Sequence, residues 1–318
     1  MQANICTYFD SAFYGRGLAM IKSLLKNTSE KKIKIVVLAL DNKVEKKLNN
    51  LNIDDLIVVN LSDFLSKNTK LNKKKFNNPK EFFFSLTPSI CLYCLKNFNF
   101  DSILYVDADI YFFNEIRILY KEVEDFSIGI CSHRLPFFMK PFSNKYGIYN
   151  VGINYFKNDD IALKCLNEWN DSCLNWTPDY PNWKLPFFSD QVWLDDWPSK
   201  FKKLKIINHI GINAAPWNAI NYKFSKKNDS YYVNNKLLVA YHFSNLGKIE
   251  NNLWDANVGK LFINIKGTLL EIYEGYINQI DSYESIYLRS VKSDRNILKK
   301  IIFSSFKFLF NNEVKLKS

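Results

Sequence analysis

Two acidic side chains near the middle of the chain have the type and spacing to bind a metal ion. Asp107 and Asp109 follow an apolar run at residues 103–106, at the point where that run must leave the protein core. Two residues apart in an extended chain, both carboxylates project to one side and can face the same hard cation. The alternative is that Asp-Ala-Asp is only a polar turn. Because the flanking residues are strongly apolar, two unpaired carboxylates there would be costly, and we favour a metal site.

A histidine and a lysine later in the chain add to this pattern. His242 lies in an apolar run at residues 237–243, and Lys248 follows six residues later. Taken alone, such a histidine is more often a core residue, and such a lysine is more often a solvated surface residue. With the two carboxylates, however, an imidazole completes a ligand set that suits Mn²⁺ and tolerates Mg²⁺. A divalent ion and a fixed lysine together can neutralise a diphosphate.

The first hundred residues contain the elements that would position these groups. Apolar, β-branched runs alternate with helix-like segments, which is the pattern of a parallel sheet with crossover helices. Such sheets bind nucleotides at the carboxyl ends of their strands, where the aspartates lie. The expected strands and helices are strand 4–8, helix 18–26, strand 33–40, helix 43–51, strand 56–60, helix 81–96 and strand 102–113, which begins with the apolar run at 103–106. Residues 66–80, rich in Lys and Asn, show no periodicity and are predicted to form a solvated loop.

The pattern becomes irregular between residues 128 and 264, where aromatic loops rich in Pro, Trp and Asn separate short strands from one clear helix at 159–174. Segments of this kind often build substrate sites. We expect residues 213–218, which include Trp217, at a sugar pocket. His133 has either a sugar- or phosphate-binding role or a structural one, and His209 is assigned to structure. Asp190 could bind sugar hydroxyls. Alternatively, Ser189 or Asp190 is the N-cap of a helical turn that leads to Trp193 and Leu194, and both interpretations can hold together.

Four segments, in the same order along the chain, resemble motifs of GT-A nucleotide-sugar glycosyltransferases. They are Tyr105-Val-Asp-Ala-Asp-Ile-Tyr-Phe-Phe113, Asn150-Val-Gly152-Ile-Asn154, Ser189-Asp190-Gln191, and Tyr241-His242 with Lys248. Over about residues 1–265 the chain is similar to glycosyltransferase family 8 and to related bacterial capsule and lipooligosaccharide transferases. It departs from them in having Asn245 where the family has a Gly, a Gly at 247, and Ile249-Glu250 where Pro-Trp is usual.

The resemblance implies an α/β, GT-A (Rossmann-like) fold with a mixed, mainly parallel sheet flanked by helices. It places the catalytic domain at residues 1–265, followed at 266–318 by a helical extension with a basic amphipathic end. It also implies a metal, Mn²⁺ or Mg²⁺, bound by Asp107, Asp109 and His242. The donor-binding residues implied by the resemblance are Thr7, Tyr8, Asp10, Tyr14, Asp107 and Lys248.

The reaction implied by the resemblance is transfer of a sugar from a nucleotide-sugar donor, a UDP-sugar, to a saccharide or glycolipid acceptor of a bacterial surface glycan. The metal and Lys248 would stabilise the charge on the departing diphosphate while the sugar passes through an oxocarbenium-like state. The family retains the anomeric configuration, and Gln191 matches the position near the anomeric carbon. Asp190 is the other catalytic candidate, and with Asp195 it remains a possible base for an inverting reaction.

Composition and charge limit the other classes of function. A chain of 318 residues with 47% hydrophobic and 24% charged residues is neither a small disulfide scaffold nor disordered throughout. Its net charge of +11 is confined to residues 67–80, with six lysines and no acid, and residues 289–318, with eight basic and two acidic residues. Because the remainder is almost neutral, we expect no nucleic-acid partner but local contact with an anionic surface.

The second basic patch indicates what that surface is. Between residues 297 and 310, apolar residues alternate with lysines as in an interfacial amphipathic helix, although a helix packed on the protein's own core is the alternative. We favour an anionic membrane surface as its partner. The sequence has no signal peptide and no apolar run long enough for a span. We therefore expect a cytoplasmic protein, peripheral on the inner face of the cytoplasmic membrane, with six reduced cysteines.

Two functions from other classes fit parts of this pattern. A sugar nucleotidyltransferase would normally show a Gly-rich, basic phosphate loop after the first strand, and Gly15-Arg16-Gly17 is sparse for that purpose. A non-catalytic glycan- or membrane-binding protein would have no use for paired metal carboxylates. The nucleotide-sugar glycosyltransferase therefore remains the favoured interpretation.

Overall fold

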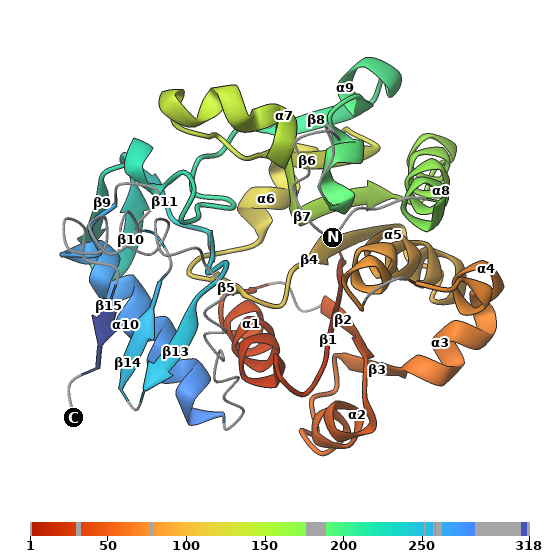
Figure 1. Cartoon of the computed structure of the whole chain (residues 1–318), viewed down its shortest axis with the longest axis horizontal. Coiled ribbons are helices and arrows are strands. Elements are labelled where there is room, and N and C mark those ends of the chain that lie inside the picture. The colour runs from red at the N-terminus through yellow and green to blue at the C-terminus, as the bar shows by residue number, and fades with distance from the viewer. Residues whose placement is uncertain are drawn as a thin grey trace, which may run out of the picture. The chain divides into compact units, whose positions relative to one another are not determined.

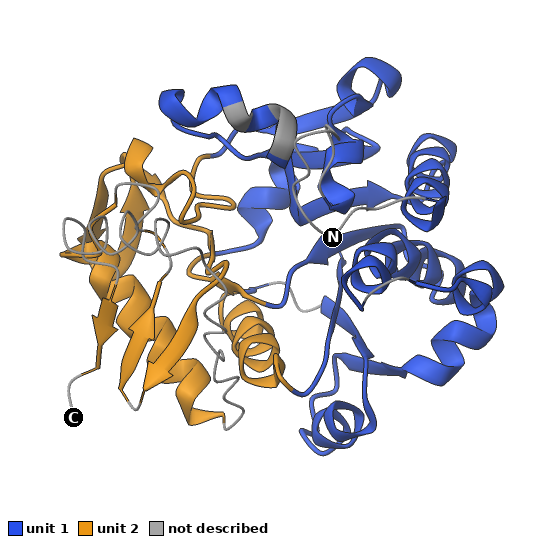
Figure 2. Ribbon diagram, viewed as in Figure 1, with its two compact units in different colours: residues 1–11, 28–108, 115–209 blue, residues 12–27, 109–114, 210–318 orange. Residues whose placement is uncertain are grey.

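The computed structural model describes residues 2–29, 33–76, 79–175, 189–250, 252–256, 258, 263–283 and 313–316. The chain divides into two compact units (Figure 2). Unit 1 comprises residues 1–11, 28–108 and 115–209, and unit 2 comprises residues 12–27, 109–114 and 210–318. Each unit has its own hydrophobic core.

Unit 1 is built on a seven-stranded sheet with the strand order β3-β2-β1-β4-β7-β6-β8. The strands are β1 (Ala3–Phe9), β2 (Ile33–Ala39), β3 (Leu56–Asn60), β4 (Ser102–Val106), β6 (Ile128–Ser132), β7 (Tyr149–Lys157) and β8 (Leu204–Ile207). The strands β3, β2, β1 and β4 run parallel to one another. The strand β7 is antiparallel to both of its neighbours, β4 and β6, and β8 is parallel to β6. This confirms the predicted mixed, mainly parallel sheet.

Helices flank the sheet of unit 1 (Figure 1). They are α2 (Asn42–Asn49), α3 (Leu61–Lys67), α4 (Thr69–Lys73), α5 (Pro79–Asn97), α6 (Arg117–Val123), α7 (Ser143–Tyr146), α8 (Asp160–Asn175) and α9 (Trp197–Lys200), with the 3₁₀ helices η1 (Phe137–Phe142) and η2 (Asp190–Leu194). Side-chain caps start two of them, because Asp41 accepts a hydrogen bond from the backbone N of Val44 and Asn60 accepts one from Asp63.

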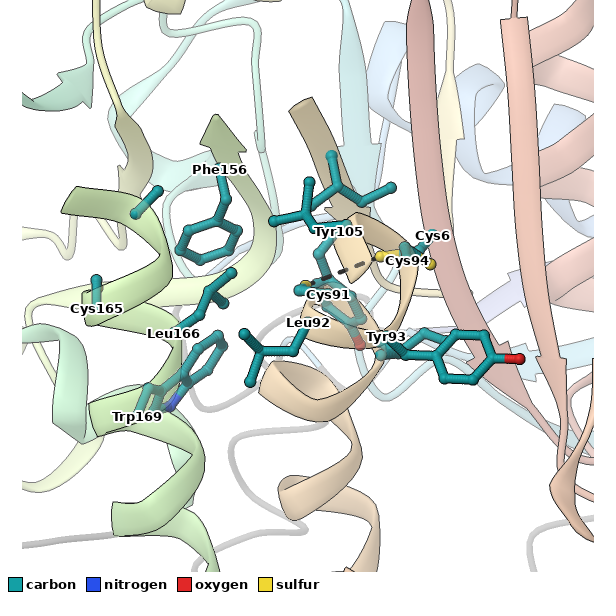
Figure 3. Packing of buried hydrophobic residues seen from close by; sticks show 14 of the residues in the cluster. Cys6, Cys91, Leu92, Tyr93, Cys94, Tyr105, Phe156, Cys165, Leu166 and Trp169 are labelled. Atoms are coloured by element: carbon teal, nitrogen blue, oxygen red, sulfur yellow. Dashed lines mark hydrogen bonds between the residues drawn. The ribbon is translucent and has the colours of Figure 1, made fainter. Parts of the chain in front are cut away.

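The core of unit 1 lies where α5 packs against α8 and against the strands β1 and β4. Figure 3 shows this packing, with Leu166 and Trp169 of α8 facing side chains of α5. All six cysteines are free, in line with the expected reduced thiols, and all six are buried. The sulfurs of Cys6 and Cys91 lie 3.8 Å apart, which is far longer than a disulfide bond.

Unit 2 combines short strands with two long helices around an aromatic core. Its elements are α1 (Tyr14–Lys26), β5 (Ile110–Phe112), η3 (Ala219–Asn221), β9 (Phe224–Lys227), β10 (Ser230–Val233), β11 (Lys236–Leu237), β12 (Ala240–His242), β13 (Gly247–Glu250), β14 (Leu253–Asp255), α10 (Thr268–Ser282) and β15 (Glu313–Lys315). The strand β5 pairs with β12, and β13, β14 and β15 form a separate sheet. Nothing in the sequence pattern indicates β15, whose Val314 is fully buried.

Several expectations differ from the structure or lie beyond it. The expected strand at 102–113 is divided into β4 and β5. Residues 66–80 are not simply a loop, because α3 and α4 extend through residue 73 and α5 begins at Pro79. The physical reason is that Leu71 is buried in the core of unit 1, which holds α4 against that core. The expected strand at 237–243 is broken into β11 and β12. The predicted amphipathic helix at 297–310 lies outside the described residues, and the domain boundary at 265 stays a prediction. None of the described helices combines the length and apolar character needed to cross a membrane.

Candidate active site

Asp107 lies immediately after β4, the buried central strand of unit 1. Its backbone N donates to the carbonyl oxygen of Gly152 on β7, 2.9 Å away, which fixes the chain direction at the strand end. Its carboxylate accepts a 2.7 Å hydrogen bond from the hydroxyl of Tyr105. The apolar run therefore does deliver an aspartate to the carboxyl end of a parallel strand, where the sequence predicted it.

Asp109 begins the second segment of unit 2 and faces His242. The strands β5 and β12 pair antiparallel with Ile110 opposite His242, and this register brings the imidazole beside the aspartate. His242 Nε2 lies 3.0 Å from Asp109 Oδ1, and the backbone N of Phe243 donates to the carbonyl oxygen of Asp109. Burial opposes ionisation of Asp109, but the charges of His242 and Arg16 outweigh it, so the pKa of this carboxyl lies below its ordinary value.

Ligand atoms of Asp107, Asp109 and His242 all lie within 4.8 Å of one another. Two carboxylate oxygens and an imidazole nitrogen are the donor set that Mn²⁺ accepts and Mg²⁺ tolerates, so the residues present fit such an ion. The imidazole is 6% exposed and the Asp109 side chain is 17% exposed, so water is largely kept from this pair. The ring of Trp217 stands edge-on to that of His242, with centroids 5.0 Å apart. The expectation that residues 213–218 lie at the site is consistent with this contact.

Asp190 lies in η2, in a buried polar network that sequence analysis did not predict. Its carboxylate accepts a 3.0 Å hydrogen bond from Thr87 of α5, and Tyr8 of β1 lies 3.1 Å from the same threonine oxygen. Burial first, and then the charge of Asp107, raise the pKa of Asp190 to about 7. An aspartic acid with this pKa can hold or release a proton near neutral pH.

The backbone just before Asp190 is strained. Ser189 has φ 62° and ψ −179°, a region that only glycine adopts easily, and it is 4% exposed. Ser189 occupies the N-cap position of η2 without a side-chain cap hydrogen bond, so the capping interpretation fails for this residue. Strain of this kind is concentrated at functional sites, where the surrounding structure enforces it.

Gln191, Asn150 and His133 form a second polar group in unit 1. Asn150 Nδ2 lies 3.3 Å from Gln191 Oε1 and 3.4 Å from His133 Nε2. The Gln191 amide nitrogen donates a 2.7 Å hydrogen bond to the carbonyl oxygen of Tyr146. Two of the four predicted motifs, Asn-X-Gly and Asp-Gln, thus meet in space, and His133 joins them. Asp195 is engaged elsewhere, accepting 2.7 Å and 3.3 Å hydrogen bonds from the backbone N of Ile148 and of Tyr149.

Lys248 is buried, at 5% exposure, which excludes the solvated surface lysine. Its Nζ lies 2.7 Å from Asp281 Oδ1 on α10 and 5.6 Å from the centre of the Trp254 ring. The departure from the family pattern in the preceding turn has a simple explanation. Asn245 has φ 62°, the left-handed conformation that glycine adopts freely and that asparagine adopts more readily than most other residues. Asparagine therefore replaces glycine here without changing the backbone.

The remaining predicted donor-binding residues lie at the end of β1 and the start of α1. Thr7 is fully buried, whereas Asp10 is partly exposed. The hydroxyl of Tyr8 donates to the carbonyl oxygen of Phe83, which directs it toward α5. Tyr14 is 6% exposed, while its neighbour Phe13 is 40% exposed. Their roles in donor binding stay predictions.

Three residues of these networks were not identified from the sequence. Arg16 was considered only as part of a sparse glycine loop, and Thr87 and Asp281 were not considered at all. A serine, threonine or aspartate on a helix carries no local signal that distinguishes a buried partner from a solvated residue. Arg16 could have been identified, because it lies among the apolar residues at the start of α1. A charged residue in such a position indicates a buried cation with a specific partner.

Comparisons with known proteins agree on the fold. Residues 4–194 match the family model described as Glycosyl transferase family 8. The uncharacterized protein YfnD of Bacillus subtilis (strain 168) is 25% identical over 230 residues, covering 71% of this chain and 72% of that protein. The galactosyltransferase LgtC, solved with donor and acceptor sugar analogs, superposes with a TM-score of 0.51 at 14% identity, covering 92% and 98% of the two chains.

A second solved structure, the apo form of mouse xyloside xylosyltransferase 1, also has a TM-score of 0.51, at 12% identity, and covers 77% of this chain and 98% of that one. At these identities the likeness concerns the fold alone. It is the GT-A fold that the order of the four motifs predicted, and the matched family model covers more than half of the chain.

Proposed function

The chain belongs to glycosyl transferase family 8 and is a glycosyltransferase, and from this premise we propose that it moves a sugar from a UDP-sugar to an acceptor in a bacterial surface glycan, with retention of configuration. The observation that carries the proposal is the cluster of Asp107, Asp109 and His242, which is the ligand set expected for a metal that binds a nucleoside diphosphate.

The residues divide the chemistry as follows. A divalent ion held by Asp107, Asp109 and His242 would supply positive charge to the leaving diphosphate. Lys248 is a fixed cation in a mostly buried position, so it can stabilise the same developing charge with little competition from water. Its present partner Asp281 keeps the ammonium paired until an anion arrives.

The acidic and amide side chains of η2 would serve the sugar. Gln191 is oriented by Asn150 and by the carbonyl of Tyr146, so its amide has a fixed direction, as a group near the anomeric carbon requires. Asp190, with a pKa of about 7, can bind a hydroxyl in either protonation state. If the reaction inverts, Asp190 is the better base, because Asp195 already accepts two backbone hydrogen bonds.

The first test is a panel of nucleotide sugars incubated with Mn²⁺ and scored for release of nucleoside diphosphate. We expect turnover with a UDP-sugar and a loss of at least about a hundredfold in kcat for Gln191→Ala, a change that removes an oriented amide. NMR of the product's anomeric proton decides between retention and inversion. Release of pyrophosphate from UTP and a sugar 1-phosphate, without activity on nucleotide sugars, would instead identify a nucleotidyltransferase.

We also propose that the basic segment between α10 and β15 binds an anionic membrane on the cytoplasmic face. The support is its pattern of lysines between apolar residues. Each lysine near an anionic leaflet contributes about 1 kcal/mol.

The test for this partner is pelleting with phosphatidylserine vesicles. Replacing Lys299, Lys300 and Lys307 by Gln should abolish pelleting while leaving β15 intact. The matched control replaces Lys43, Lys46 and Lys202, three exposed lysines outside both basic patches, and should pellet like the native chain. Unchanged pelleting of the first variant would refute the membrane assignment.

A further inference from the structure

Arg16, at the start of α1, is a buried cation that the proposed chemistry does not use. It is 7% exposed, although burying a charge without compensation is costly. Among the described residues its guanidinium donates one hydrogen bond, to the carbonyl oxygen of Leu246 at 2.7 Å, and forms no direct ion pair. The ring of Phe13 lies 4.9 Å from its central carbon, a cation–π distance. The guanidinium is therefore held at a defined place.

The Arg16 guanidinium lies at the turn between His242, a proposed metal ligand, and Lys248, the proposed phosphate-binding lysine. The turn is closed by the backbone N of Leu246 donating to the carbonyl oxygen of Phe243, and Phe243 itself donates to the carbonyl oxygen of Asp109. Asn245 supplies its left-handed residue. Lys248 follows two residues after the carbonyl that Arg16 binds. An anchor at Leu246 thus constrains the path of the chain from His242 to Lys248.

Electrostatics supply a reason for an arginine at this position. The charge of Arg16 acts on Asp109 in the same sense as that of His242, favouring the carboxylate. A lysine could supply this charge, but its single nitrogen lacks the planar fork that holds a guanidinium in one orientation. The hydrogen bond to Leu246 and the ring contact with Phe13 use that planar shape.

We propose that Arg16 is a positioning residue for the diphosphate site, holding the turn 243–246 so that Lys248 is presented to the nucleoside diphosphate. This rests on the proposed function, because it assigns Lys248 to that ligand. Arg16 acts through the turn and through Lys248, and the proposal does not require it to touch the donor.

The test is a double-mutant cycle on binding of UDP with Mn²⁺, measured by calorimetry. We expect Arg16→Met to weaken UDP binding about tenfold, the result of misplacing one charge-assisted contact. In the background of Lys248→Met, the same change should have an effect of less than twofold, because the residue it positions is gone. Arg16→Lys should behave like Arg16→Met, and the exposed Arg117→Met should behave like the native chain. Additive effects of the two methionine variants, or full rescue by Arg16→Lys, would overturn the proposal.

A second measurement does not depend on any ligand. Hydrogen exchange at the amides of residues 246–248 should be at least about tenfold faster in Arg16→Met than in the native chain, because an anchor of the turn is lost, while exchange in β1 and β2 stays unchanged. Unchanged exchange at the turn would overturn the positioning role even if UDP binding fell. If the native chain binds no nucleoside diphosphate but exchange is faster in Arg16→Met, the anchoring of the turn stands and the proposed function fails.

Discussion

The carboxylates of the two units are compensated in different ways. In unit 1, Asp107 and Asp190 accept hydrogen bonds from the uncharged hydroxyls of Tyr105 and Thr87. In unit 2, Asp109 faces His242 and lies within the field of Arg16. Burial, and then repulsion from Asp107, raises the pKa of Asp190 in unit 1, whereas in unit 2 His242 and Arg16 offset the burial of Asp109 and its pKa falls.

This difference shows which ligand each group is suited to. Acids that repel each other and accept hydrogen bonds from uncharged hydroxyls gain from a nearby cation, whether a metal ion or a sugar carbon that develops positive charge. The cations Arg16 and Lys248 of unit 2 are suited to an anion, and the diphosphate is the anion that the proposed reaction supplies. Variants that replace one acid in each unit test this difference.

The largest effect is expected from the two aspartates of the proposed metal site. Asp107→Asn and Asp109→Asn should each lower Mn²⁺ affinity by at least about a hundredfold, because each removes an anionic ligand. Their effects on stability without metal should be opposite in direction. Asp109→Asn leaves a buried cation uncompensated and should cost about 2 kcal/mol, while Asp107→Asn relieves repulsion with Asp190 and should be neutral or stabilising.

Calorimetry with Mn²⁺ and urea denaturation in EDTA measure the two quantities. The exposed Asp125→Asn serves as the control for loss of one negative charge. Equal destabilisation by the two variants would show that the two acids are not differently compensated.

The next effect concerns the ion pair of Lys248 and Asp281. Asp281→Asn leaves a buried ammonium without its anion and should lower the free energy of unfolding by about 2 kcal/mol. The double variant Lys248→Met/Asp281→Asn should be more stable than Asp281→Asn alone, because no charge is then stranded. Urea denaturation measures all three variants. A double variant less stable than Asp281→Asn would contradict a charge-pairing role.

A pH dependence follows from Asp190. Its pKa is about 7 in the folded chain and ordinarily near 3.8, so the folded chain binds more protons between these values. The free energy of unfolding should therefore fall as pH rises from about 4 to about 7, by up to a few kcal/mol in metal-free buffer. Asp190→Asn should reduce this slope to the part contributed by Asp195, whose pKa burial raises to about 6, and bound Mn²⁺ should also reduce it by offsetting the charge of Asp107. Thermal melts across this range in EDTA test the claim, which fails if the slope in the variant equals that of the native chain.

The smallest effect is expected at Asn245. Asn245→Gly should leave stability within about 0.5 kcal/mol of the native value, whereas Asn245→Ala should cost about 1 kcal/mol, because alanine disfavours positive φ. Thermal denaturation of the pair gives the difference directly. Equal stability of the two variants would indicate that the turn relaxes to another conformation.

Local patterns predicted most of unit 1 because its strands are continuous apolar runs, and β3 at Leu56–Asn60 matches the predicted bounds. The metal cluster was predictable because Asp-X-Asp and the histidine have distinctive types. The partners of these residues were not, since Thr87 meets Asp190 across 103 positions and Lys248 meets Asp281 across 33. Such pairings depend on helix packing. In unit 2, short strands of two to four residues leave too few positions for a period to show, which is why the run 237–243 was predicted as one strand.

The pairing of β5 with β12 has a consequence for how this protein family can vary. Asp109 and His242 are 133 positions apart, yet their geometry depends on a ladder of three residue pairs. Loops inserted or deleted between them leave that ladder untouched, so the intervening segment can vary in length. A shift of one residue within β12, by contrast, would turn the imidazole to the opposite face. Evolution can thus rebuild specificity across the intervening segment while the metal ligands stay in register.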